Sequence, residues 1–183
     1  MARAGAAIVL VGALGACGAS KPTSSEAASA EVAETVCTML RDWNNDIGDR
    51  LNTTSQAITD GDDPDTANGV LADGFDDLIA LTEEHRAALD ELDLPDVQDR
   101  DALLAELRDG ADESVALLEE RRDEIDDLEP ITVDRQAGAL GGAFTAVEGA
   151  LAVIEPEIGG FRPELRDAFT GNEGCRHVIQ PYD

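Results

Sequence analysis

His85 is the polar residue whose position in the sequence most favours a chemical role. It falls on an apolar helical stripe, and antiparallel pairing with an earlier helical segment would place it near Met39 and Trp43. A histidine in that position is a candidate ligand contact or a pH-sensitive element. The alternative is a bundle histidine that is hydrogen-bonded to Thr82 or Glu84, or one that is exposed near the end of its helix.

The motifs of metal centres and nucleophilic enzymes are incomplete in this chain. A carboxylate-bridged metal site in a helical bundle uses Glu-x-x-His, but Thr82 and Gly174 stand three residues before His85 and His177. His-Glu-x-x-His and Cys-x-x-Cys do not occur, and two histidines outside any nucleophile motif leave no Ser-His-Asp grouping to assign. We therefore expect no catalytic residues, no metal and no cofactor, and we expect His177 to pack or cap beside Cys175.

The acidic loop Asp60–Asp65 suggests calcium, because clustered carboxylates suit a hard cation. An EF-hand loop that began at Asp60 would have Pro64 at its fifth position and Leu71 at its twelfth, so the pattern fails. A solvated turn that caps the flanking helices is the favoured interpretation, with weak surface binding of a cation as the alternative.

Small residues recur every four positions at Gly138, Gly142, Ala146 and Ala150. Such a line allows another backbone to approach closely. Tight packing inside a bundle is the favoured interpretation, and a small-molecule pocket or membrane entry are the alternatives. If the protein binds a ligand between helices, His85, Trp43, Gly138 and Gly142 are the candidate walls.

Helices must position these residues, because apolar side chains recur at alternating three- and four-residue steps along the chain. The predicted helical segments are Val32–Ile58, Pro64–Leu94, Leu104–Leu128 and Val133–Ile158, followed by a short helix that begins near Pro163. Short connections favour antiparallel neighbours. The sequence therefore predicts an all-α fold, an antiparallel up-down four-helix bundle with a short C-terminal helix, closed by one disulfide.

The first residues have the character of an export signal. Arg3 precedes the uncharged apolar run Ala6–Leu14, which is too short to span a membrane but suits a secretory signal. The run ends in Leu14-Gly15-Ala16-Cys17, which resembles the lipobox of bacterial lipoproteins. The resemblance implies cleavage before Cys17 and attachment of a diacylglyceryl group to its thiol; the alternative is an ordinary signal peptide with a chance cysteine.

The chain is thus expected to have three parts. Residues 1–16 are a signal peptide, 17–30 a lipidated cysteine with a flexible tether, inferred from small, polar, proline-containing composition, and 31–183 the helical bundle domain. In an exported protein the remaining pair, Cys37 and Cys175, is expected to form a disulfide rather than two free buried thiols.

The formal net charge of −27 opposes binding to nucleic acid. A body this acidic also has no basic patch to hold it on an anionic bilayer, so it needs the lipid anchor. We expect a structural or protein-interaction module, with an unknown protein partner, anchored by lipid to the extracytoplasmic face of the cell membrane. The alternative is a lipoprotein that holds a small apolar molecule or a cation between its helices.

Overall fold

The computed structural model describes residues 23–61, 64–126, 145 and 156–176. Every regular element in those ranges is helical, so the predicted all-α class is confirmed there. The elements are α1 (Ser24–Asp60), α2 (Pro64–Glu91), α3 (Arg100–Asp126) and α5 (Pro163–Gly171), with short 3₁₀ helices at Ile158–Gly160 (η1) and Glu173–Cys175 (η2). None of the helices in these ranges is long and apolar enough to cross a membrane.

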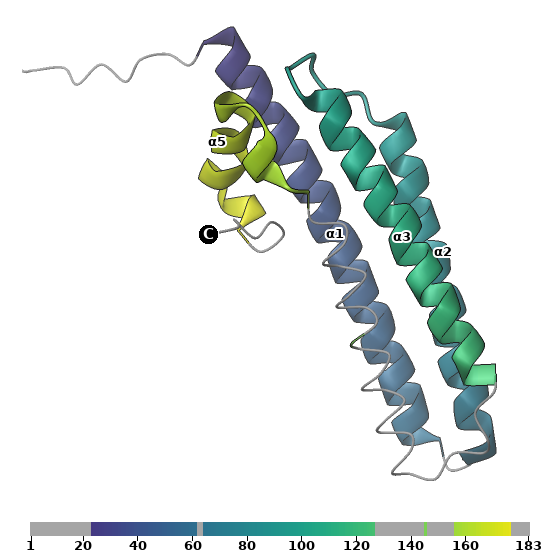
Figure 1. The fold of residues 1–183 in the computed structure, drawn as a ribbon. Helices are drawn as coiled ribbons and strands as arrows, with labels where there is room; N and C mark the ends of the chain where they lie inside the picture. Colours follow the sequence, from purple (N-terminus) through teal and green to yellow (C-terminus); the bar gives the residue numbers. More distant parts are fainter. Residues whose placement is uncertain (1–22, 62–63, 127–144, 146–155, 177–183) are drawn as a thin grey trace, which may run out of the picture.

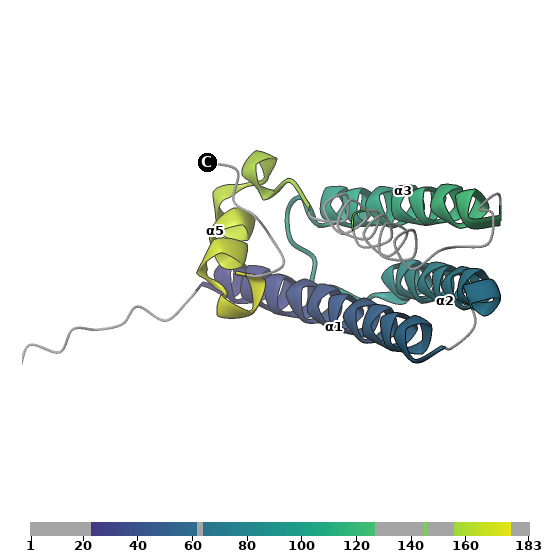
Figure 2. The same ribbon diagram turned by 90° about the horizontal axis from the view of Figure 1, so that it is seen from below.

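The long helices lie lengthwise beside one another (Figures 1 and 2). α2 packs along both α1 and α3, and α5 packs against the N-terminal half of α1. α5 begins at Pro163, as predicted, because proline suits the first turn of a helix, and it buries Leu165 and Phe169. The C-terminal part of the chain is thereby attached to the start of the first long helix.

The first helix begins earlier than the sequence suggested. We expected a flexible tether as far as Ala30, but α1 starts at Ser24. The hydroxyl of Thr23 accepts a hydrogen bond from the Glu26 amide at 3.2 Å, and the Thr23 amide donates to the Glu26 carboxylate at 2.6 Å. This reciprocal capping box lowers the pKa of Glu26 and, with the alanines that follow, extends the helix into the expected tether.

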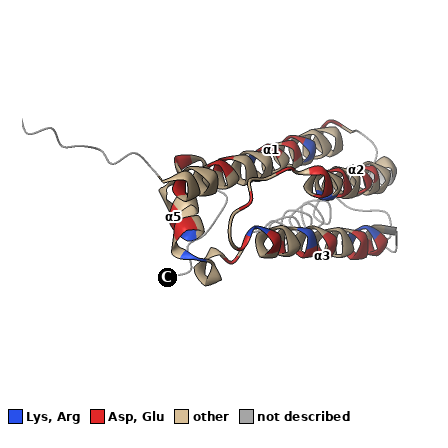
Figure 3. Cartoon of the chain, turned by 90° about the horizontal axis from the view of Figure 1, so that it is seen from above, with Lys and Arg blue, Asp and Glu red and all other residues tan. Residues whose placement is uncertain are grey.

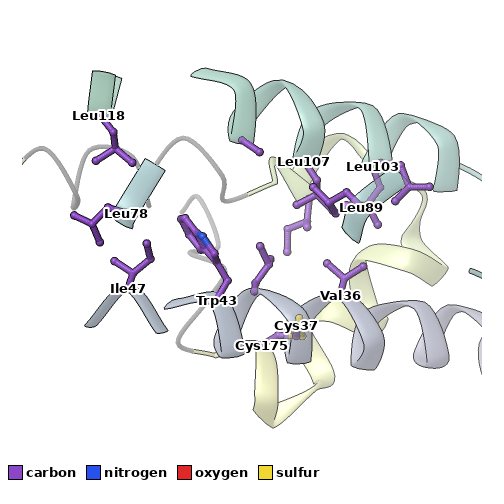
Figure 4. Close-up of a cluster of buried hydrophobic side chains, with 14 of the residues drawn as sticks. Val36, Cys37, Trp43, Ile47, Leu78, Leu89, Leu103, Leu107, Leu118 and Cys175 are labelled. Carbon is purple, nitrogen blue, oxygen red and sulfur yellow. A yellow bond between two sulfur atoms is a disulfide. The ribbon is translucent and has the colours of Figure 1, made fainter. Parts of the chain in front are cut away.

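The apolar stripes of the three long helices meet in one core. Figure 4 shows side chains of all three converging; they include Val36 and Ile47 of α1, Leu78 and Leu89 of α2, and Leu103, Leu107 and Leu118 of α3. The predicted stripe of the second segment is confirmed from Leu71 to Leu89, and Leu92 is partly buried against the core. In α1, Leu40 is buried in the core, whereas Met39 is only partly buried against it.

The predicted disulfide between Cys37 and Cys175 is confirmed. It joins α1 to η2 across a sequence separation of 138 residues, and both cysteines are buried, with exposed fractions of 1% and 2%. Figure 4 shows the sulfur atoms bonded at the edge of the core. The bond therefore fastens the C-terminal segment to the first helix.

A second attachment links the α2–α3 connection to the C-terminal segment. Asp99, which directly precedes α3, has a left-handed backbone with φ of 70°, a conformation that aspartate adopts more readily than most residues. Its carboxylate accepts a hydrogen bond from the Arg162 amide at 2.7 Å, just before α5 begins.

The predicted fourth segment falls largely outside the described residues. Of residues 133–155 only Thr145 is described, and it is helical. The prediction that this helix continues to Ile158 is wrong: Pro156 and Glu157 are not helical, and Ile158 begins η1. Pro156 itself has no amide N–H that could donate within a helical turn.

Acidic residues occur on all of the labelled helices, with few basic residues between them (Figure 3). Several arginines form ion pairs between helices: Arg50–Asp77 at 2.9 Å joins α1 to α2, and Arg86–Asp112 at 3.0 Å and Arg122–Asp76 at 2.9 Å join α2 to α3. Such exposed pairs contribute little stability each, about 1 kcal/mol or less. The buried core therefore dominates the packing.

Candidate functional site between α1 and α2

An open groove with a cavity volume of about 650 Å³ lies between α1 and α2. Its apolar wall includes Met39 and Trp43 of α1 and Leu81 of α2, with His85 beside them. Residues three and four apart share one face of a helix, so Met39 and Trp43 line the groove together from one side and Leu81 and His85 from the other.

The rings of Trp43 and His85 stack in the wall of this groove. Their centroids are 5.1 Å apart and their planes differ by 28°. Each residue has an exposed fraction of 6%. The predicted proximity of His85 to Met39 and Trp43 is thus confirmed, and the alternative of a histidine exposed near a helix end is wrong.

Each of the stacked rings carries a buried nitrogen without a partner. Neither Nε1 of Trp43 nor Nε2 of His85 has a hydrogen-bond partner in the part of the chain that the structure describes. The hydroxyl of Thr82 donates instead to the Leu78 carbonyl at 2.9 Å. Leaving a buried polar atom unsatisfied costs about 1–3 kcal/mol, so each such atom needs an explanation, such as a bound water, ion or ligand.

The imidazole of His85 is neutral at pH 7, because burial lowers its pKa to about 4. The carboxylates of Glu34, Asp42, Asp46 and Glu84 also line the groove, and none of the described lining residues is basic. Asp42 is paired with Arg41, which does not line the groove, at 3.3 Å. The groove therefore combines a neutral aromatic wall with a negative rim.

A cavity of this volume falls within the range of small-molecule sites, about 300–1,000 Å³. Its apolar wall would bury the body of a ligand, and the ring nitrogens and carboxylates would orient polar groups. Across the described residues, no group of three or more histidine, cysteine, aspartate or glutamate side chains is placed to hold a metal ion. The acidic loop is a break between helices: α1 ends at Asp60 and α2 begins at Pro64, with residues 62–63 outside the described part.

The structure brings together two of the four candidate ligand-binding residues, Trp43 and His85. Gly138 and Gly142 lie outside the described residues, as do the proposed lipidation site Cys17 and His177. Sequence reasoning missed the carboxylates that Glu34, Asp42 and Asp46 of α1 contribute to the groove. Their spacing of eight and four residues was a detectable signal, because it keeps them on one side of a helix.

Comparison of the chain with models of protein families, with curated proteins and with solved structures gives no match.

Proposed function

We propose that this chain is a lipid-anchored, extracytoplasmic binding protein that holds a small ligand in the groove between α1 and α2. The observation that carries the proposal is the stacked pair of Trp43 and His85 in the wall of an open groove, whose buried ring nitrogens lack partners among the described residues. Two unsatisfied polar atoms at one place add nothing to the stability of a bundle, whereas a ligand towards which the rings turn would offset their cost.

The proposed location rests on the sequence and is supported by the disulfide. Leu14-Gly15-Ala16-Cys17 resembles a lipobox, and disulfides persist mainly in exported proteins. The Cys17→Ala variant is expected to be released into the medium, because no polybasic segment would hold an acidic chain on the bilayer. Retention of that variant at the membrane would contradict the anchor.

We also propose that the described helices belong to an antiparallel up-down four-helix bundle, whose fourth helix is the segment Val133–Glu155. The order of the contacting residues along each helix supports opposite directions for neighbouring helices. Trp43 contacts His85, whereas Arg50, further along α1, pairs with Asp77, which comes earlier in α2. Arg86 pairs with Asp112, whereas Asp76, earlier in α2, pairs with Arg122, later in α3. These pairs support opposite directions for α2 and α3 as well.

Ligand binding is tested by a thermal-shift screen of small molecules on a matched pair of variants. Ala88 lines the groove and is exposed, so Ala88→Phe fills the groove without entering the core; Ala87 is equally exposed but does not line it. A true ligand should stabilise the wild type and Ala87→Phe by about 2.7 kcal/mol at a hundredfold excess over its Kd. It should not stabilise Ala88→Phe.

The competing proposal is the structural or protein-interaction module with an unknown protein partner. Two results together would favour this competing proposal. No compound stabilises Ala87→Phe without also stabilising Ala88→Phe, and cross-linking in intact cells captures one protein that binds both variants.

A further inference from the structure

We infer that the groove between α1 and α2 binds a small organic cation, whose apolar stem lies against Met39, Trp43 and Leu81 while its charged head lies among the rim carboxylates. The inference rests on the proposed binding function and adds the chemical class of the ligand.

The charges that line the groove favour a ligand of positive charge. Both helices contribute carboxylates, and no described residue pairs with those of Glu34, Asp46 or Glu84. The two arginines adjacent to lining residues in the sequence are already engaged, Arg41 with Asp42 and Arg86 with Asp90 and Asp112. An anion is therefore repelled at the rim, whereas a cation is attracted by carboxylates that no described residue compensates.

The spacing of the carboxylates favours an organic cation over a metal ion. Glu34 and Asp46 stand at the two ends of the groove on α1, and twelve residues of helix span about 18 Å. A calcium ion needs several oxygens within about 2.6 Å of one point. Among the residues described, no three acidic, histidine or cysteine side chains approach that arrangement. Dispersed carboxylates share no point at which a metal ion could sit, so they suit an organic cation whose apolar body lies along the groove.

The stacked rings provide the polar contacts within the apolar wall. Both ring nitrogens are buried in this wall, so they reach a ligand only when the rings turn towards the groove; the indole N–H of Trp43 then donates to an acceptor oxygen. Burial keeps the imidazole of His85 neutral at pH 7, so His85 does not repel a cation. In the tautomer protonated at Nδ1, its Nε2 accepts a hydrogen bond from an ammonium group.

The test compares three probes that share a six-carbon chain and differ in charge: hexylammonium, 1-hexanol and hexanoate. The full chain with Cys17→Ser avoids lipidation and the need for detergent. Trp43 is the only tryptophan, so its fluorescence reports on the groove directly. We expect hexylammonium to bind about tenfold more tightly than hexanoate and more tightly than 1-hexanol, since several exposed charge pairs add up to roughly that factor.

Matched variants separate the rim from the overall acidity of the protein. Asp46→Asn with Glu84→Gln removes two carboxylates of the groove, and we expect it to weaken hexylammonium roughly fivefold while leaving 1-hexanol unchanged. Asp49→Asn with Glu83→Gln removes the same charge from exposed positions that do not line the groove, and should change neither affinity.

The outcomes distinguish this inference from the proposed function. Equal or tighter binding of 1-hexanol or hexanoate, blocked by Ala88→Phe, overturns the cation inference and leaves the binding groove standing. Equal weakening of hexylammonium by both double variants also overturns it, because the attraction would then belong to the whole acidic surface. If no probe binds and the thermal-shift screen gives no ligand that Ala88→Phe blocks, both proposals fail.

Discussion

Acidification should destabilise this protein through the buried ring of His85. Burial lowers the pKa of His85 from 6.5, the value for an exposed histidine, to about 4. The unfolded chain therefore takes up the proton at a higher pH than the folded chain does. Stability is complete above about pH 6.5 and is lost as the pH falls towards 4. The loss is about 2 kcal/mol at pH 5 and about 3 kcal/mol when complete.

Other charged groups surround His85. They are Glu34, Asp42 and Asp46 on α1, Glu84 on α2, and Asp112 of α3, which is paired with Arg86. Protonation of carboxylates also relieves the self-repulsion of a chain with a formal charge of −27, which opposes the effect of His85. The wild type and a variant that lacks only the imidazole have the same carboxylates. The difference between their pH profiles therefore reports on His85 alone.

The assay is urea denaturation, followed by circular dichroism, of the wild type and of His85→Leu between pH 7 and pH 4. Leucine has a similar volume and does not titrate. We expect the wild type to lose about 2 kcal/mol more than the variant between pH 7 and pH 5. The fluorescence of Trp43 in the folded wild type should change near pH 4, because a protonated imidazole stacked on the indole quenches it. Parallel pH profiles for the two proteins, or a fluorescence change near pH 6.5, would refute the reasoning.

Two further predictions concern the packing of the fold. A Cβ atom at Gly74 of α2 would lie 2.6 Å from the side chain of Thr54 in α1, whereas one at Gly69 meets nothing within 4 Å. Gly74→Ala should therefore destabilise the protein by about 1–2 kcal/mol and Gly69→Ala should stabilise it by up to about 1 kcal/mol, as measured by urea denaturation; equal effects would mean that the helices do not approach closely at Gly74. Reduction of the bond between Cys37 and Cys175 should cost on the order of 5 kcal/mol in the chain-entropy model, given the 138-residue separation, and an unchanged urea midpoint with reductant would contradict that role.

The helices and the core were predictable from local pattern. Residues three and four apart share a helix face whatever the rest of the chain does, so the stripe from Leu71 to Leu89 identified the buried side of α2 in advance. The pairing of Cys37 with Cys175 followed from the cysteine count and the presumed compartment. The start of α1 was misjudged, because the polar composition before Ala30 was given more weight than the capping box of Thr23 and Glu26.

The properties of the groove depended on how α1 and α2 are packed. That His85 meets Trp43 was foreseen from the register of the helices, but the missing hydrogen bonds of the two rings were not. A hydrogen bond depends on the position of atoms from separate elements, and no spacing along one helix reveals that both nitrogens lack partners among the described residues. The shift in the pKa of His85 has the same origin, because desolvation depends on what covers the ring in three dimensions. The sequence thus contained the acidic residues and the aromatic ring, and only the packing of two helices made them the rim and the wall of one cavity.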